Sequence, residues 1–192
     1  KGPFSIMQLF KKDKLKNIVS SAFNNSLSPK YAFGHARLVT NGTQLKDANN
    51  QPVIKDGIIG VHNGIVVNVN ELWKEHSEIN RENEIDTEVL LALIRFELQK
   101  GKSVKTAVSK SINKVKGTVA TALVFDDLNK FILATNNGSL YVLHNNKDVL
   151  FFASEHHMLS KFENKIDLSE VGNYQIQQIK SNNGLIIDLE NF

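Results

Sequence analysis

The sequence predicts an α+β fold in which helices pack around antiparallel sheets. Two apolar stretches with helical spacing occupy residues 86–117, and each is closed by a glycine. Four short runs rich in β-branched and aromatic side chains follow over residues 118–154, separated by Asn- and Asp-rich turns. Sheets with helices between and around them indicate a layered α+β domain.

The N-terminal third predicts a strand, a helix and a second strand. Residues 4–10 have the composition of a short strand. Apolar side chains recur at i, i+3, i+4, i+7 and i+8 over residues 15–23, which predicts an amphipathic helix of about three turns. Residues 31–40 have the pattern of a buried strand, and a long polar connection is expected over residues 41–56.

The central stretch, residues 58–67, has two β-branched runs separated by Asn63-Gly64. Asn and Gly tolerate the positive φ of primed turns, so this pattern predicts a β-hairpin with its turn at this pair. A functional interpretation is also open. A Gly amide beside an Asn carboxamide places two donors together, and two such donors can hold a developing oxyanion.

Three helices are expected next, over residues 70–76, 89–98 and 104–115. Asn68 or Asn70 is expected to cap the first, Gly101 to end the second, and Ser103 to cap the third, with Gly117 ending it. The strands 118–125, 131–135, 140–144 and 149–154 then predict an antiparallel meander. A short helix over residues 156–162 and strands over residues 175–180 and 185–189 complete the chain.

Composition places the chain among globular proteins with one core. Its 192 residues contain 41% hydrophobic and 22% charged residues, and no internal boundary or repeat is visible, so we expect a single domain over residues 1–192. No apolar run approaches the roughly 18 residues of a membrane span. The balance of 23 basic and 20 acidic side chains gives little support for nucleic-acid binding.

The chain contains no Cys. This excludes disulfides, thiolate metal sites and a thiol nucleophile within these residues, and it fits a reducing, cytoplasmic location. The six His lack metal-ligand spacing, so we expect them to be structural or solvent-facing and we expect no metal site. There is no Gly-rich phosphate loop either, and no cofactor is expected.

Arg37 and Asp86 are the charged residues with the clearest functional interpretation. Arg37 lies in an apolar stretch, where it must pair either with a protein carboxylate or with the carboxylate of a ligand. Asp86 stands at the head of a helix, either as an N-cap or as the partner of a ligand ammonium. Together the two charges could hold both ends of an α-amino acid.

Three motifs in order resemble those of class II glutamine amidotransferases. They are Gly34-His35-Ala36-Arg37 with Thr40-Asn41-Gly42, Val61-His62-Asn63-Gly64-Ile65, and Asp86-Thr87-Glu88-Val89. The resemblance implies a four-layer αββα sandwich of the N-terminal-nucleophile hydrolase type, lacking its first strand. It extends over almost the whole chain.

The resemblance also implies roles for individual residues. Arg37, assisted by Thr40 and Asn41, would bind the α-carboxylate of glutamine, and Asp86 would bind its α-amino group. The Asn63 side chain and the Gly64 amide would form the oxyanion hole. The family's nucleophile is an N-terminal Cys, which we expect upstream of Lys1, so the 192 residues by themselves should be inactive.

The implied activity is hydrolysis of glutamine to glutamate, with ammonia passed to a synthase or isomerase domain or partner protein, most simply for aminosugar synthesis. Some positions depart from that branch. Leu38 stands where the aminosugar branch commonly has Trp, Asn41 replaces its His, and Asn50-Gln51-Pro52 leans toward the asparagine synthetase branch. The alternatives are an asparagine synthetase-type glutaminase, a non-catalytic amino-acid-binding module, and a proteasome-like or acylase relative, which would not need the Arg37/Asp86 clamp.

Overall fold

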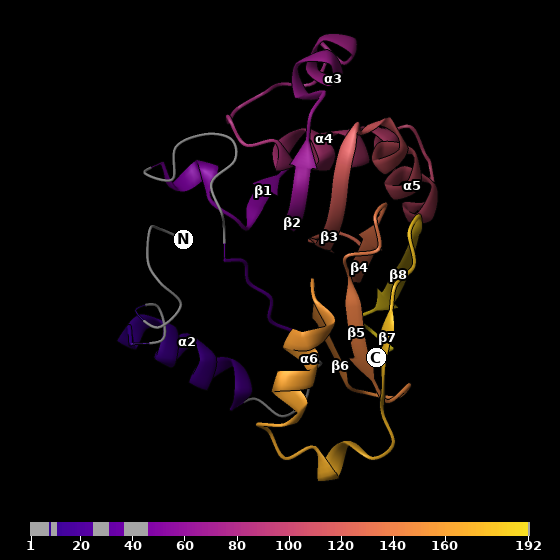
Figure 1. Ribbon diagram of the computed structural model, residues 1–192. Coiled ribbons are helices and arrows are strands. Elements are labelled where there is room, and N and C mark those ends of the chain that lie inside the picture. The colour runs from indigo at the N-terminus through magenta and orange to yellow at the C-terminus, as the bar shows by residue number, and fades with distance from the viewer. Residues whose placement is uncertain (1–7, 9–10, 25–30, 37–45, 192) are drawn as a thin grey trace.

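The computed structural model describes residue 8 and residues 11–24, 31–36 and 46–191, and within them it contains two antiparallel sheets (Figure 1). Sheet A has five strands in the order β1 (Val53–Lys55), β2 (Ile58–Val66), β3 (Gly117–Phe125), β4 (Lys130–Thr135) and β8 (Asn183–Asp188). Sheet B has three, in the order β6 (Leu150–Ala153), β5 (Tyr141–His144) and β7 (Gln175–Gln178).

The described helices begin and end close to the predicted positions. They are α2 (Asp13–Phe23), α3 (Val69–Glu75), α4 (Thr87–Gln99), α5 (Val104–Lys114) and α6 (His156–Glu163), with short 3-10 turns η1 (Asp47–Asn49) and η2 (Ser169–Val171). Gly101 follows α4 with φ +75°, a conformation that suits the residue after a helix end. The Ser103 hydroxyl accepts from Thr106 N at 3.3 Å and so caps α5, as predicted.

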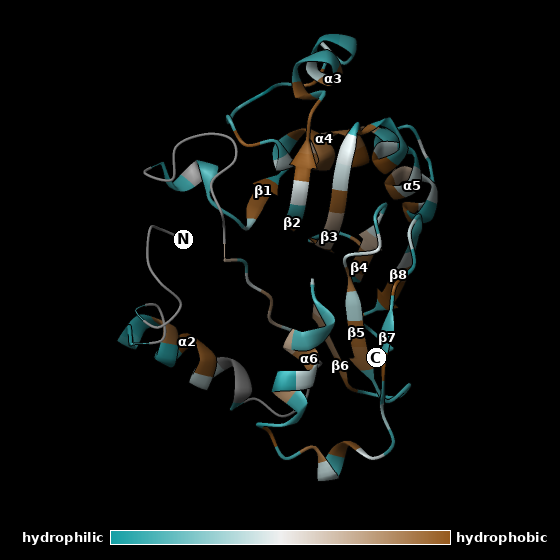
Figure 2. Cartoon of the chain, in the orientation of Figure 1, coloured by the Kyte–Doolittle hydropathy of each residue, from teal (hydrophilic) through white to brown (hydrophobic). Residues whose placement is uncertain are grey.

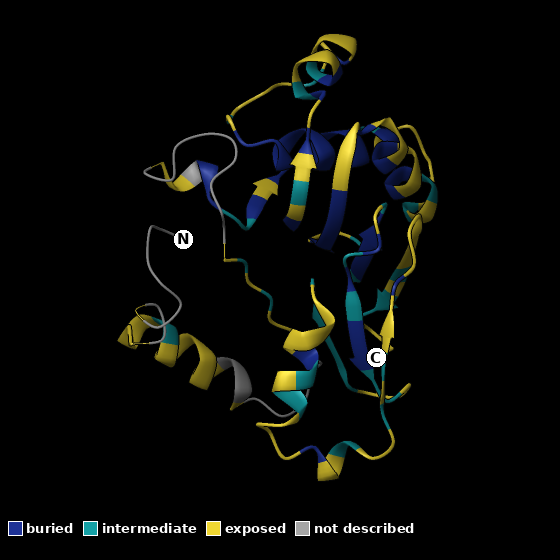
Figure 3. Cartoon of the chain, in the orientation of Figure 1, coloured by how far each residue is buried: buried dark blue, intermediate teal, exposed yellow. Residues whose placement is uncertain are grey.

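The elements form four layers, which confirms the predicted αββα sandwich. Helices α4 and α5 pack on one face of sheet A, and their shared core includes Leu90, Ile94, Ile112 and Leu123. The other face of sheet A packs on sheet B, and α6 covers the outer face of sheet B through Leu159. Helix α4 is apolar and buried around most of its surface, as expected for a helix inside a large core (Figures 2 and 3).

The predicted meander is wrong in its pairing, although its strands are correctly placed. Strand β4 pairs with β8 and strand β5 pairs with β6 and β7, so β4 and β5 belong to different sheets. The chain changes sheets at residues 136–140, where the Thr135 hydroxyl accepts from the backbone N–H groups of Asn137 and Gly138. Gly138 has φ +81°, which allows the turn between the sheets.

The predicted hairpin at Asn63-Gly64 is also wrong. Residues 58–66 form one continuous strand, β2, which pairs along its whole length with β3 and sets Asn63 opposite Ala120. The turn lies earlier, at Asp56-Gly57, where both residues have positive φ and join β1 to β2. A primed turn therefore exists, but Asp-Gly supplies it and Asn-Gly does not.

The N-terminal predictions are met only in part. The helix over residues 15–23 is confirmed as α2, with Ile18 and Val19 exposed at 56% and 43%. The strand expected over residues 4–10 falls outside the described residues except for Gln8, which is helical. Residues 31–36 form no regular strand, and the part of the 41–56 connection that is described contains η1 and β1.

Candidate active site

The residues proposed from the sequence fall into two groups. Arg37, Thr40 and Asn41 lie outside the described residues. Asn63, Gly64 and Asp86 are described. Asn63 and Gly64 lie in β2, toward the end that leads to α3, and Asp86 contacts the last residue of β2, Val66. The structure therefore gives the geometry of the predicted oxyanion donors and of one half of the predicted substrate clamp.

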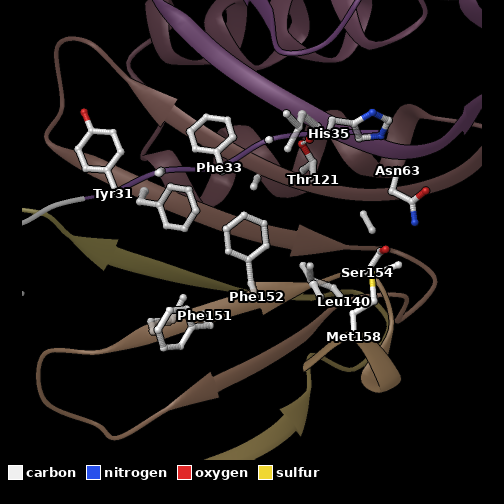
Figure 4. A pocket seen from close by; sticks show the side chains of 18 of the residues that line it. Tyr31, Phe33, His35, Asn63, Thr121, Leu140, Phe151, Phe152, Ser154 and Met158 are labelled. Atoms are coloured by element: carbon white, nitrogen blue, oxygen red, sulfur yellow. Dashed lines mark hydrogen bonds between the residues drawn. The ribbon is translucent and has the colours of Figure 1, made fainter. Parts of the chain in front are cut away.

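A cavity of about 750 Å³ lies between the two sheets. Its lining is mostly aromatic and aliphatic and includes Phe33, Phe131 and Phe152, with ring centroids 5.6–5.9 Å apart between Phe131 and the other two. Figure 4 shows Tyr31, Phe33 and Phe151 toward one end and the polar side chains of His35, Asn63 and Ser154 toward the other. The polar end is the place where a polar substrate would be recognised.

Asn63 lies on the cavity side of β2 because side chains alternate along a strand. Val61 and Asn63 line the cavity, whereas His62 and Val66 are buried on the α4 side of the sheet. The Asn63 carboxamide is exposed and points into the polar end of the cavity (Figure 4). It is therefore accessible to a bound molecule.

Gly64 is fixed as glycine by its surroundings. Its φ is +148°, and a Cβ at this position would lie 2.0 Å from the Thr118 carbonyl oxygen and 2.8 Å from Nε2 of His62. Any other residue would collide with the backbone of β3. The Asn-Gly pair thus reflects a close approach of two strands and not a turn.

Asp86 is buried, with 4% of its surface exposed. It occupies the N-cap position of α4, which is one of the two roles that the sequence suggested. Its side chain makes no capping hydrogen bond, however. Its Oδ2 accepts instead from the backbone N–H of Val66 at 2.9 Å. Asp86 thereby ties the start of α4 to β2, two residues beyond Gly64, and it is not among the residues that line the cavity.

His62 is buried next to Asn63, which agrees with the structural role that the sequence allowed for it. Its ring is 2% exposed, with Nε2 3.0 Å from the Thr118 carbonyl oxygen and Nδ1 3.4 Å from the Thr87 hydroxyl. A carbonyl oxygen only accepts, so Nε2 carries the proton and Nδ1 accepts. Burial lowers the pKa of His62, against the opposing effects of the Thr118 carbonyl and the Asp86 charge, and keeps the ring neutral.

A buried ion pair that the sequence did not reveal supports the segment before Asp86. Glu88 is fully buried and accepts from the backbone N–H groups of Glu82 and Asn83 at 2.8 and 2.7 Å. Lys55 Nζ lies 3.6 Å from Glu88 and donates to the Asn80 carbonyl at 2.9 Å. Burial acts to lower the pKa of Lys55, but the bond to Glu82 and the surrounding carboxylates raise it overall.

No group of three or more His, Asp or Glu is arranged to hold a metal ion in residues 8, 11–24, 31–36 and 46–191. Among the helices described in these same ranges, none is long and apolar enough to cross a membrane.

A model of the glutamine amidotransferase domain family matches residues 35–161, which include the cavity wall, β2 and the start of α4. The chain belongs to the glutamine amidotransferase domain family. Within it, the chain is of the class II, N-terminal-nucleophile type, and the curated proteins to which it is similar include glutamine–fructose-6-phosphate aminotransferases. The resemblance inferred from the three motifs is confirmed.

Curated relatives of this amidotransferase domain include two glutamine–fructose-6-phosphate aminotransferases. The one from Zymomonas mobilis is 31% identical over 165 residues, covering 85% of this chain and 27% of that protein. The one from Thermococcus kodakarensis is 33% identical over 148 residues, covering 74% of this chain and 24% of that protein. The chain thus spans about a quarter of the length of the curated relatives it matches.

Two solved structures share the fold. The glutamine phosphoribosylpyrophosphate amidotransferase of B. subtilis gives a TM-score of 0.52 at 22% identity, covering 81% of this chain and 34% of that one. A second structure, described as the allosteric regulatory enzyme of purine biosynthesis, gives a TM-score of 0.54 at 23% identity. The match covers 74% of this chain and 30% of that one. These likenesses confirm the predicted fold of two antiparallel sheets with helices around them.

Proposed function

We propose that this chain is the glutaminase domain of a longer protein or complex, that it hydrolyses glutamine to glutamate, and that it supplies the ammonia to a synthase. The observation that carries the proposal is the placement of Asn63 and Gly64. The Asn63 carboxamide reaches the polar end of the cavity. The next residue, Gly64, has a backbone conformation and surroundings that only glycine fits. The family match supports the same chemistry.

In the proposed reaction, a Cys that precedes Lys1 in the full-length protein attacks the side-chain amide of glutamine. The amide oxygen becomes an oxyanion, held by Nδ2 of Asn63 and the backbone N–H of Gly64. The proton removed from the thiol goes to the leaving nitrogen, ammonia departs, and water hydrolyses the thioester to glutamate. The chain itself contains no Cys, so these 192 residues supply binding and stabilisation only.

The substrate clamp is proposed to use complementary charges. Arg37, with Thr40 and Asn41, would bind the α-carboxylate, and Asp86 would attract the α-ammonium. One Asp86 oxygen already accepts from Val66 N, which leaves the second oxygen for a ligand. Only 4% of Asp86 is exposed in the structure, so contact with a ligand requires this carboxylate to become accessible. We propose that this change accompanies the entry of glutamine.

The ammonia acceptor proposed is a sugar phosphate, as the names of the curated relatives indicate for those proteins. The synthase or isomerase function would belong to a further domain or to a partner protein. An asparagine synthetase-type acceptor remains the competing assignment because of Asn50-Gln51-Pro52.

The test is glutamate release from glutamine by the full-length protein, with and without a candidate sugar phosphate. The proposal expects hydrolysis in the wild type and a KM raised on the order of tenfold or more in Arg37→Ala, because the bidentate carboxylate contact is lost. Arg81 is exposed, donates to the Asn70 side chain and the Asn83 carbonyl, and is not among the residues that line the cavity, so Arg81→Ala serves as the matched control with unchanged KM. Absence of hydrolysis in a full-length protein that carries the upstream Cys would refute it.

A non-catalytic amino-acid-binding module is the second candidate, favoured by the absence of Cys from the chain. It expects saturable glutamine binding by calorimetry without turnover. Turnover of glutamine by the full-length protein excludes this candidate.

A further inference from the structure

The side-chain amide of Gln51 forms a double hydrogen bond with the backbone of β2. Its Oε1 accepts from His62 N at 2.6 Å, and its Nε2 donates to the His62 carbonyl at 2.7 Å. The second distance lies at the lower limit of the usual range for N–H···O bonds and the first lies just below that limit. The residue bound is the one immediately before Asn63.

The register of the sheet explains why a side chain takes this place. Strands β1 and β2 pair through Val53 opposite Gly60, and continuation of the ladder would set Gln51 opposite His62. The ladder stops at Val53, the first residue of β1, and Pro52 separates Gln51 from that strand. A carboxamide has the same donor and acceptor as a peptide group, so the Gln51 side chain completes the pair that the backbone leaves open.

His62 is therefore held from three directions. Gln51 holds its backbone, Thr118 holds its ring from β3, and Thr87 holds the ring from α4. Four residues later, Asp86 holds Val66 N. The Asn63-Gly64 pair lies between these two fixed points, with β3 paired along its other side.

We infer that Gln51 is a positioning residue for Asn63 and Gly64, and that its carboxamide fixes the direction of the two oxyanion donors. The inference rests on the proposed glutaminase function, and it assigns to Gln51 a role through His62 and not a contact with substrate. Preorganised donors contribute to a reaction only when they are fixed where the charge develops, so a loosened clamp should lower kcat more than it raises KM.

The first experiment measures glutamine hydrolysis and amide hydrogen exchange in the full-length protein. Gln51→Met keeps the chain length but removes both bonds. Gln99→Met is the matched control, because Gln99 is exposed at the end of α4. We expect about a tenfold lower kcat with KM within about twofold for Gln51→Met, and about tenfold faster exchange in peptides spanning Ile58–Val66.

The second experiment uses Gln51→Glu and a pH series. A carboxylate accepts from His62 N but repels the His62 carbonyl, whereas a protonated carboxyl accepts with one oxygen and donates with the other. The kcat of this variant divided by that of the wild type should therefore rise toward one as the pH falls. The charged groups on the surrounding elements are His62, Asp86, the Lys46–Glu84 pair and the Lys55–Glu88 pair. All are also present in the wild type, so division by the wild-type kcat removes the pH dependence that both proteins share.

Each outcome decides the inference. Exchange and kcat of Gln51→Met equal to those of Gln99→Met would overturn it, and so would faster exchange with unchanged kcat, which would make the clamp structural only. The inference would also be contradicted if the kcat of Gln51→Glu divided by that of the wild type did not change with pH. If the wild type hydrolyses no glutamine, the proposed function fails, and the exchange comparison alone decides whether Gln51 fixes Asn63 and Gly64.

Discussion

Asp86 combines a structural and a proposed binding role, and two substitutions separate them. Asp86→Ala leaves the buried Val66 N–H without its acceptor, which should cost about 1–3 kcal/mol of unfolding free energy. Asp86→Asn keeps an acceptor oxygen for Val66 but removes the charge. We expect it to retain most of the stability, as measured by urea denaturation, while it weakens glutamine binding about as much as the alanine variant.

Glutamine binding by the same two variants also shows whether the proposed binding role of Asp86 is wrong. If Asp86→Asn binds glutamine as well as the wild type does, the carboxylate is only a tie between α4 and β2. The sequence suggested an N-cap or a ligand partner for Asp86, and neither interpretation anticipated the bond to Val66, because that contact joins residues 20 apart along the chain.

His62 predicts a specific pH dependence of stability. Burial lowers its pKa in the folded state, so the unfolded chain takes up the proton first as the pH falls. The stabilising effect of the neutral ring is complete above about pH 6.5 and is lost as the pH falls from there toward the lower folded-state pKa. Denaturation between pH 7 and pH 5 should show this loss in the wild type and much less of it in His62→Gln.

The control for this measurement is His157→Gln, because His157 is exposed on α6. It should keep the pH dependence of the wild type. An equal slope in His62→Gln and the wild type would contradict the assignment of a buried, neutral His62.

At the scale of the element, β2 depends on Gly64, which lies near the end of the strand that leads toward α3. Gly64→Ala would place a Cβ 2.0 Å from the Thr118 carbonyl oxygen at φ +148°, so β2 and β3 would have to separate. We expect a loss of more than about 3 kcal/mol of unfolding free energy. Gly101→Ala meets open space after α4 and should cost only about 1 kcal/mol. Similar losses in the two variants, measured by thermal unfolding, would contradict the close approach of the strands.

The connection between α3 and α4 depends on the buried Lys55–Glu88 pair. Lys55→Met leaves Glu88 buried without its cation, which should cost about 3 kcal/mol. Lys116→Met removes an exposed pair with Glu71 and should leave the stability unchanged. Urea denaturation of the two variants compares them directly, and equal midpoints would show that the buried pair does not stabilise the connection.

The elements themselves were largely predictable, and their errors have local causes. Helices α4 and α5 and strands β3 to β6 follow from periodicity and turn residues, because these signals lie within each element. The hairpin at Asn63-Gly64 was wrong because the same dipeptide serves a turn and a close approach of strands. The difference depends on Thr118, which lies far away in the sequence.

At the scale of the whole molecule, the layers were predictable from the family resemblance and not from residue patterns alone. Patterns placed strands at 130–135 and 141–144 but could not assign them to different sheets, since the pairing of β4 with β8 joins residues far apart in the sequence, from Lys130 with Asp188 to Thr135 with Asn183. Of the candidate site, the Asn63-Gly64 and Asp86 motifs were identified from the sequence. Gln51, His62 and Glu88 act through long-range contacts, which no local pattern reveals.

Asn63 is the residue that we propose stabilises the oxyanion of glutamine hydrolysis. The most direct test is the kcat for glutamate release by the full-length protein with Asn63→Ala, relative to the wild type. Asn63 is exposed, so its replacement should not disturb the fold. We expect a kcat lowered by about 10²- to 10³-fold with KM little changed. A variant as active as the wild type would contradict it.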